Sequence, residues 1–468
     1  MSIVTHQDPS DKSSSRGALC QQRREALRQD IMTAITPTVV GVFNQALEVE
    51  VTSYIGRLKG VHRASLKAAV SPLVCPACSR QATLDFVRNG HYERTLVTLW
   101  GDLRLSVPRV ECVCGHCPAL PPILFDRHDR LWSDLDAAII QYTALALSLR
   151  SVSAVLELQS GQVVSIGAVQ RRVAGVAVLA ARALAERVTS VSPVIMLDGL
   201  WGTFMAKTGE CKRDKKGRLR QVKRKQKVPL LVAYGVDPIT GEKQVLAWVQ
   251  GTSEDAGAWE RLLTMLHERG VHYDSGLRLF VHDGSSGLEA ALDLVDFGAV
   301  RRQRCIFHKL RNLIRDVLGT EEMTRAQKRE RVQVVLEDAC AVYEAPSAEQ
   351  ARRRATEFRL KWSALEPKAV ATLERDFGLT LTYYEVIAEA QAGGEAWLEV
   401  YLRTTSGLER FNRDLRCKWR QAGAYWSAEG LEGAFWLVTC KRADHDQTTR
   451  IGWIAPIVAQ MLESRCVR

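Results

Sequence analysis

The sequence lacks the features that mark membrane, secreted and fibrous proteins. No run of about 18 uncharged apolar residues occurs, so no segment is expected to span a membrane. The first 19 residues are polar and serine-rich, without the apolar core of a secretory signal, and we expect a disordered leader there. Twelve cysteines in 468 residues are too few for a disulfide framework. We therefore expect a cytoplasmic protein with reduced cysteines.

Positive charge is in excess. Lysine and arginine total 64 against 53 aspartate and glutamate residues, a formal net charge of +11. Such a surplus favours a polyanionic partner, most often nucleic acid, although a solvated basic surface is the simpler alternative. A nucleic-acid partner would place the protein with the nucleoid.

The length suggests about three domains at roughly 150 residues each. An apolar fraction of 46% and a charged fraction of 25% are ordinary for a globular chain. Pro37 interrupts an apolar helical periodicity and is expected to kink or restart a helix. The expected segments are a leader (1–19), a helical segment (20–70), a cysteine-rich module (71–120), a helical trio (130–187), an α/β core (190–319), a helical insertion (320–400) and the C-terminal part of the core (401–468).

Two Cys-x-x-Cys pairs predict a structural zinc site. Cys75 with Cys78 and Cys114 with Cys117 would give four thiolates, the closed tetrahedral set of a zinc ribbon. The segment 95–107 between them reads as a β-hairpin with a turn at Gly101-Asp102. Cys112 or His116 could replace one thiolate. The alternative is a group of free buried cysteines.

The region 130–187 predicts three helices. Apolar spacing supports helices over 135–149, 150–158 and 166–185, with a turn at Ser160-Gly161. This spacing fits a helix-turn-helix that presents Arg171 and Arg172 to DNA. An ordinary helical bundle is the alternative.

Two acids follow buried strands of the α/β core. Asp198 ends the apolar run 193–198, and Asp283 ends the run 279–283. Between them, ten of the sixteen residues from Lys212 to Lys227 are basic, and we expect this segment to connect two strands. The order of three strands, helix, strand, helix and strand (299–306) predicts a mixed five-stranded ribonuclease H-like sheet. In that fold the first and fourth strands are neighbours, so the two carboxylates should lie close together.

A pair of Mg²⁺ ions suits such carboxylates, because magnesium prefers oxygen ligands and phosphoryl transfer commonly uses two ions. The second ion needs a third acid. We choose Glu409 and keep Glu399 as the alternative. The residues expected to contact DNA on the same helix are Arg410, Asn412, Arg413 and Arg416.

These motifs resemble the Mutator-like DDE family of bacterial insertion-sequence transposases. The three acids stand in MLDG, VHDGSSGL and TTSGLERFNRDLR, and the segment QRCIFHKLRN carries a Cys-x-x-His signature. The helical block at 320–400 matches the insertion of that family. The resemblance implies a ribonuclease H-like fold, DNA strand cleavage and transfer, and Mg²⁺ or Mn²⁺ as the metal.

Cys305 and His308 form the Cys-x-x-His signature. Two ligands are too few for a closed zinc site, so we expect both side chains to pack near the active site, with His308 close to the scissile phosphate. A metal-binding pair is the alternative. Lys309 and Arg311 are expected to contact DNA.

The sequence thus predicts a DDE transposase that cuts the ends of an insertion sequence and joins their 3′-hydroxyls to target DNA. The partners would be the terminal inverted repeats, the target duplex and a second copy of the chain. Two alternatives remain: a ribonuclease H-like nuclease or resolvase, and a non-catalytic zinc-containing DNA-binding protein derived from a transposase.

Overall fold

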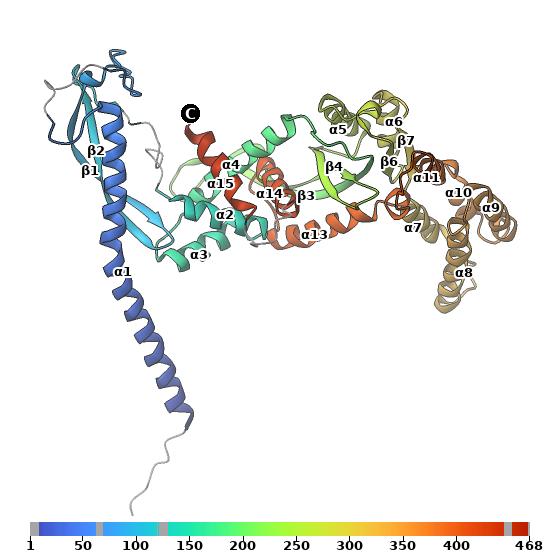
Figure 1. The fold of residues 1–468 in the computed structure, drawn as a ribbon. Helices are drawn as coiled ribbons and strands as arrows, with labels where there is room; N and C mark the ends of the chain where they lie inside the picture. The colour runs from blue at the N-terminus through green and yellow to red at the C-terminus, as the bar shows by residue number, and fades with distance from the viewer. Residues whose placement is uncertain (1–8, 62–68, 119, 121–129, 444–451, 467–468) are drawn as a thin grey trace, which may run out of the picture. The chain divides into compact units, whose positions relative to one another are not determined.

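The computed structural model describes residues 9–61, 69–118, 120, 130–443 and 452–466 (Figure 1). The chain forms two compact units. The first contains Met1–Gln141, Leu149–Arg172 and Ile454–Arg468, and the second contains Tyr142–Ser148 and Val173–Trp453. Among the described residues, no helix has the length and apolarity needed to cross a membrane.

The first unit pairs a long helix with a β-hairpin. Helix α1 (Pro9–Ile55) continues through Pro37, so the proline does not end it, and residues 9–19 are helical rather than a disordered leader. Residues 1–8 lie outside the described part. Strands β1 (Phe86–Thr98) and β2 (Gly101–Cys112) pair antiparallel, as the sequence predicted. Leu47 and Val51 of α1 are buried in two small cores shared with this hairpin. A short 3-10 helix, η2 (Thr83–Asp85), precedes the hairpin, and α15 (Ile454–Cys466) also belongs to this unit.

The three helices expected in 130–187 are present. They are α2 (Ser133–Ala144), α3 (Leu149–Ser160) and α4 (Ile166–Ala185). The Ser165 hydroxyl accepts a hydrogen bond from the Ala168 N–H at 3.2 Å, which caps the start of α4. DNA binding by these helices stays a prediction.

A mixed five-stranded sheet forms the centre of the second unit. Its strands are β3 (Val194–Arg213), β4 (Leu219–Val236), β5 (Lys243–Gln250), β6 (Leu279–His282) and β7 (Arg301–Arg304). They lie in the order β5-β4-β3-β6-β7. The pairs β3–β4 and β4–β5 are antiparallel, whereas β3–β6 and β6–β7 are parallel. The predicted contact between the first and fourth strands is therefore confirmed.

Two strand boundaries differ from the predictions. The basic segment expected to connect strands is itself β-structure, because β3 and β4 stay paired as far as Arg213 and Leu219. Asp198 therefore lies within β3 instead of at its end. The fifth strand is also shorter than predicted: it ends at Arg304, and helix α7 (Ile306–Asp316) follows.

Helices cover both faces of this sheet. Alternate residues of β3 and β4, such as Ile195 and Leu231, share a buried apolar core with α5 (Ala256–Glu268) and α6 (Ser286–Leu294). On the opposite face, the side chains of Trp419 and Leu431 come close to the backbone of Gly202 on β3. They belong to α13 (Ser406–Ala422) and α14 (Ala428–Ala443). A short 3-10 helix, η3 (Tyr273–Ser275), precedes β6.

The predicted insertion is helical and is attached to the last strand. It contains α8 (Arg325–Tyr343), α9 (Ala348–Trp362), α10 (Pro367–Glu374), η4 (Gly378–Thr380) and α11 (Thr382–Ala392), and α12 (Val400–Arg403) leads out of it. Arg304 of β7 forms a 2.8 Å ion pair with Asp376. The buried amide of Gln303 donates to the Thr380 carbonyl at 2.9 Å and accepts from the Tyr383 N–H at 2.9 Å.

Candidate active site and cysteine cluster

Asp198 and Asp283 lie at corresponding positions of neighbouring parallel strands. The register pairs Leu197 of β3 with His282 of β6, and each acid is the next residue. Asp198 Oδ1 accepts a hydrogen bond from the Gly199 N–H at 2.9 Å, and Asp283 Oδ1 accepts one from the Ser285 N–H at 2.9 Å. These bonds fix both carboxylates at the end of the sheet where α6 begins.

The third predicted acid reaches the same place from α13. Glu409 is in the first turn of this helix, and Asn412 follows three residues later. The Asn412 amide donates to Asp198 Oδ2 at 2.8 Å. Glu399, the alternative third acid, forms a 2.7 Å ion pair with Arg403.

The three carboxylates influence one another electrostatically. Burial, the neighbouring Asp283 and, more weakly, Glu409 raise the pKa of Asp198 to about 7, against the hydrogen bonds from Gly199 and Asn412. A bound cation would remove this repulsion. Carboxylate oxygens are the ligands that Mg²⁺ and Mn²⁺ prefer, so the residues present fit a divalent metal.

Cys305 and His308 pack behind Glu409. The Thr405 N–H donates to Cys305 Sγ at 3.3 Å, and the Thr405 hydroxyl donates to Glu409 Oε1 at 3.1 Å. His308 Nε2 lies 3.5 Å from the same Glu409 oxygen. Burial lowers the pKa of His308 and raises the pKa of Cys305, so both are neutral near pH 7.

This arrangement favours the packed interpretation of the Cys-x-x-His signature. Ligand atoms of Cys305, His308 and Glu409 all lie within 4.8 Å of one another, which is close enough to hold a metal. Cys305 Sγ, however, already accepts hydrogen bonds from the N–H of Thr405 at 3.3 Å and from its hydroxyl at 3.4 Å. His308 is only 6% exposed, and its imidazole faces the Glu409 carboxylate.

Three residues expected to contact DNA are buried instead. Arg172 forms a 2.7 Å ion pair with Asp136. Lys309 is 3% exposed and donates to the Arg375 carbonyl, and burial lowers its pKa to about 8. Asn412 is fully buried against Asp198. The other predicted DNA contacts are all exposed: Arg171, Arg311, Arg410, Arg413 and Arg416.

Glu254 is a fourth acid at the site that the sequence did not single out. Burial and the charge of Asp283 raise its pKa, and the Trp201 side chain donates a hydrogen bond to it. A Cβ atom at position 199 would collide with its carboxylate, so this approach requires Gly199. Glu254 stands in an ordinary loop before α5, and no pattern in the sequence marks it.

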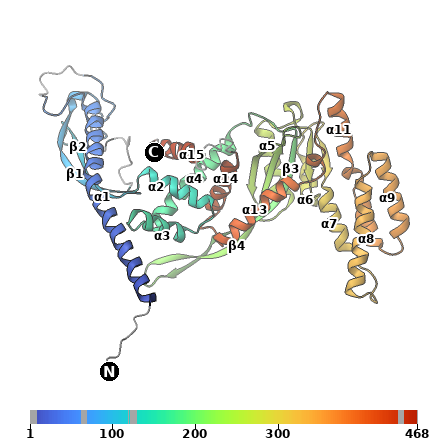
Figure 2. The same cartoon turned by 60° about the horizontal axis from the view of Figure 1, so that its bottom comes forward.

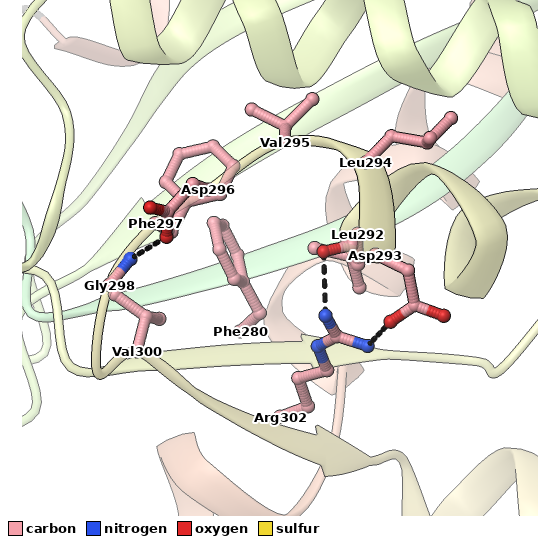
Figure 3. A pocket seen from close by; sticks show the side chains of 10 residues that line it. All are labelled: Phe280, Leu292, Asp293, Leu294, Val295, Asp296, Phe297, Gly298, Val300 and Arg302. Atoms are coloured by element: carbon pink, nitrogen blue, oxygen red, sulfur yellow. Dashed lines mark hydrogen bonds and ion pairs between the residues drawn. The ribbon is translucent and has the colours of Figure 1, made fainter.

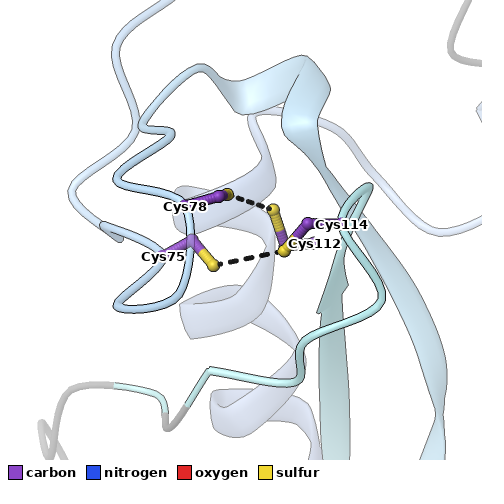
Figure 4. Close-up of side chains that lie close together, drawn as sticks. All are labelled: Cys75, Cys78, Cys112 and Cys114. Carbon is purple, nitrogen blue, oxygen red and sulfur yellow. Dashed lines mark hydrogen bonds between the residues drawn. The ribbon is translucent and has the colours of Figure 1, made fainter.

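The cysteines of the first unit form a compact cluster (Figure 4). The Sγ atoms of Cys75, Cys78, Cys112 and Cys114 all lie within 4.8 Å of one another. Cys75 is 3.7 Å from Cys114, and Cys78 is 3.6 Å from Cys112. Cys117, the predicted fourth ligand, lies outside the group and is 3.9 Å from the Asn89 amide. The structure thus places the alternative, Cys112, in the fourth position.

The cluster is chemically suited to a thiophilic metal. Burial opposes ionisation of Cys75, but hydrogen bonds from the Ala77 and Cys78 N–H groups and from the Cys78 and Cys114 thiols together lower the pKa of Cys75 to about 7. Burial raises the pKa of Cys112 to about 12. A zinc ion would provide the positive charge that holds all four as thiolates.

A hollow of about 290 Å³ lies elsewhere in the second unit (Figure 3). Its wall includes Phe280 and the loop from the end of α6 to β7. Arg302 crosses it to Asp293 at 2.6 Å. The loop enters β7 at the N-terminal end of the parallel strands, opposite the end that carries Asp283. This hollow is therefore separate from the carboxylates.

Comparisons with known proteins identify relatives. Residues 77–447 match the family described as "Transposase, Mutator family". The transposase for insertion sequence element IS406 of Burkholderia multivorans is 28% identical over 338 residues, which cover 72% of this chain and 76% of that protein. The transposase for element ISRM5 of Rhizobium meliloti is 28% identical over 333 residues, 70% of this chain and 72% of that protein.

Among solved structures, the Drosophila P element transposase strand transfer complex aligns with a TM-score of 0.35 and 11% identity. The alignment covers 68% of this chain and 92% of that chain. The family match, in contrast, extends over most of the sequence, and this chain therefore belongs to the Mutator family of transposases.

Proposed function

We propose that the protein is a DDE transposase that cleaves the ends of an insertion sequence and transfers their 3′-hydroxyl ends into target DNA. The observation that carries the proposal is the meeting of Asp198, Asp283 and Glu409. Asp198 lies on β3, Asp283 directly follows β6 and Glu409 lies on α13, and the strand order β5-β4-β3-β6-β7 is the one we expected of a ribonuclease H-like sheet.

Asp198 and Asp283 would hold one divalent ion, Mg²⁺ or Mn²⁺, and Asp198 and Glu409 a second. When bound, such ions activate the attacking oxygen and stabilise the leaving oxygen. Asn412 orients the Asp198 carboxylate through its 2.8 Å hydrogen bond. Thr405 and His308 orient Glu409.

The remaining parts would bind and position DNA. Arg410, Arg413 and Arg416 lie on the helix that carries Glu409, where they would contact phosphates. A structural zinc ion on Cys75, Cys78, Cys112 and Cys114 would stabilise the hairpin of the first unit. That unit and the helices α2–α4 would recognise the terminal inverted repeats. Pairing of two ends calls for a homodimer, acting in the cytoplasm on nucleoid DNA.

The test is a cleavage and strand-transfer assay with labelled DNA ends of the host element, in Mg²⁺ and in EDTA. We expect joined products in Mg²⁺ and none in EDTA or with Asp283→Ala. The matched control is Asp293→Ala, which removes an exposed acid of α6, 70% accessible, and should leave activity within about twofold.

Two results would contradict the proposal. Metal-dependent cleavage without joined products would identify a nuclease. Specific DNA binding without cleavage in any divalent metal would identify a non-catalytic DNA-binding protein.

A further inference from the structure

The hairpin β3–β4 continues far beyond the sheet. The outer parts of its strands, up to Arg213 and from Leu219, pair only with each other (Figure 2). No side chain from Lys207 to Lys227 is buried. We call the residues 207–227 the basic ribbon. It has no apolar face, so core packing does not explain its presence.

The charges of the basic ribbon oppose its own folding. Lys207 lies directly opposite Lys223, and Lys212 lies opposite Arg220. Like charges at such positions destabilise a strand pair, and a solvated two-stranded hairpin is marginally stable even without them.

Few acids in the ribbon compensate for this repulsion. Its acids are Glu210 and Asp214, which pair with Arg224 at 3.6 Å and Arg220 at 2.9 Å. Most of its cations therefore remain available to a polyanion.

The dimensions of the basic ribbon fit duplex DNA. At about 3.3 Å per residue, its strand 219–227 spans roughly 30 Å, close to one turn of B-DNA. The major groove admits a two-stranded β-ribbon. Lysine and arginine predominate here, and these side chains mainly contact phosphates, which carry no sequence information.

The basic ribbon is also continuous with the candidate active site. Strand β3 carries both Asp198 and Lys207, so the same strand leads from the acids into the ribbon. Between them, Trp201 is 41% exposed, and Lys227 lies over its ring at 5.2 Å. We propose that the basic ribbon is a sequence-independent clamp for duplex DNA that passes the acids; its identification with DNA rests on the proposed function.

The test is a salt titration of DNA binding by the full-length protein. Fluorescence anisotropy would follow two labelled duplexes of about 30 base pairs, roughly three helical turns, one from the element end and one of unrelated sequence. The ribbon variant carries four glutamine substitutions at exposed lysines: Lys212, Lys215, Lys216 and Lys225. The matched control carries four at exposed basic residues of α8 and α9: Arg325, Lys328, Arg329 and Arg352.

We expect the ribbon variant to lose at least about tenfold in affinity for both duplexes. The slope of log K against log salt should become shallower by about 3 to 4, because each lost phosphate contact contributes roughly 0.9. The control should keep the slope of the native protein. A second variant, with 208–222 replaced by Asn-Gly between Lys207 and Lys223, should show the same loss if the long ribbon is what binds.

Three results would overturn the proposal: an unchanged slope in both ribbon variants, an equal loss in the control, or a loss confined to the element-end duplex. Failure of the native protein to cut DNA would remove the proposed function. The clamp proposal would nevertheless be supported if both ribbon variants, and not the control, had lost affinity for both duplexes.

Discussion

At the residue scale, Asn412 shows how a buried amide stabilises a neighbouring carboxylate. The sequence suggested a DNA contact, yet the amide is buried and donates to Asp198 Oδ2. This bond stabilises the ionised carboxylate and opposes the burial and repulsion that raise the pKa of Asp198 to about 7. A proton and the proposed metal ion would therefore compete for this carboxylate near neutral pH.

The substitution Asn412→Ala should raise the pKa of Asp198 further. A hydrogen bond to a charged group contributes about 1.5–3 kcal/mol, or roughly one to two pKa units. Metal affinity should rise with pH up to about 7 in the native protein and continue to rise well above 7 in the variant. Calorimetric titration of Mn²⁺ at a series of pH values from about 5.5 to about 9 measures this difference.

The control for this experiment is Asn89→Ala, an amide on the first unit that bonds Glu111 at 2.7 Å. Its Mn²⁺ binding should follow the native pH profile. Identical profiles for Asn412→Ala and the native protein would show that the amide does not position Asp198.

The three acids could be predicted from the sequence because each stands in a local motif. In the sequence, Asp198 and Asp283 each end an apolar run, and Glu409 lies near the start of a helix rich in arginine. Burial of a single cation could not be predicted in this way. Lys309 looks like a phosphate ligand in the sequence, but it donates to a carbonyl of the insertion, 66 residues later. Whether a given lysine is exposed or buried depends on tertiary contacts such as this one, which the local sequence does not show.

At the element scale, the β-hairpins explain both a success and a failure of prediction. The hairpin of the first unit alternates apolar and polar residues, so its strands could be predicted. The outer part of β3–β4 has no such alternation, because neither of its faces is buried. A strand with no buried face shows no alternation of apolar and polar residues, so its sequence predicts a loop.

The cysteine cluster gives a prediction at the same scale. If the cluster holds the proposed zinc ion, Cys112→Ser should lower the zinc content of the purified protein, because it removes one of four converging thiols. Cys117→Ser should leave zinc content unchanged, because Cys117 lies outside the cluster. Elemental analysis of both variants measures the difference. Zinc loss in Cys117→Ser alone would restore the set predicted from the sequence.

At the scale of the whole molecule, the three acids of the proposed active site come from distant parts of the chain. The helical insertion separates Asp283 from Glu409. Strand β7 and the insertion are tied by Arg304, Gln303 and their partners, and Thr405 N–H meets Cys305 Sγ directly after the insertion. The sequence predicted the position of the insertion. It did not predict the contacts of Gln303, Arg304 and Cys305 that hold the insertion and α13 against the sheet.

Because the helical insertion lies between the second and third acids, we expect the chain to tolerate a break between α7 and α8. The loop between α7 and α8 contains residues 317–324, and Leu318 and Glu321 within it are exposed. A break there would leave Asp198 and Asp283 on the first fragment and Glu409 on the second. The two fragments would still contact each other, because α7 packs against α10 and β3 packs against α13. Two co-expressed fragments, 1–320 and 321–468, should co-purify and cut DNA together within about tenfold of the intact chain. Neither fragment should cut DNA alone, because each lacks at least one of the three acids. The amount of fragment 321–468 would therefore set the rate of transposition.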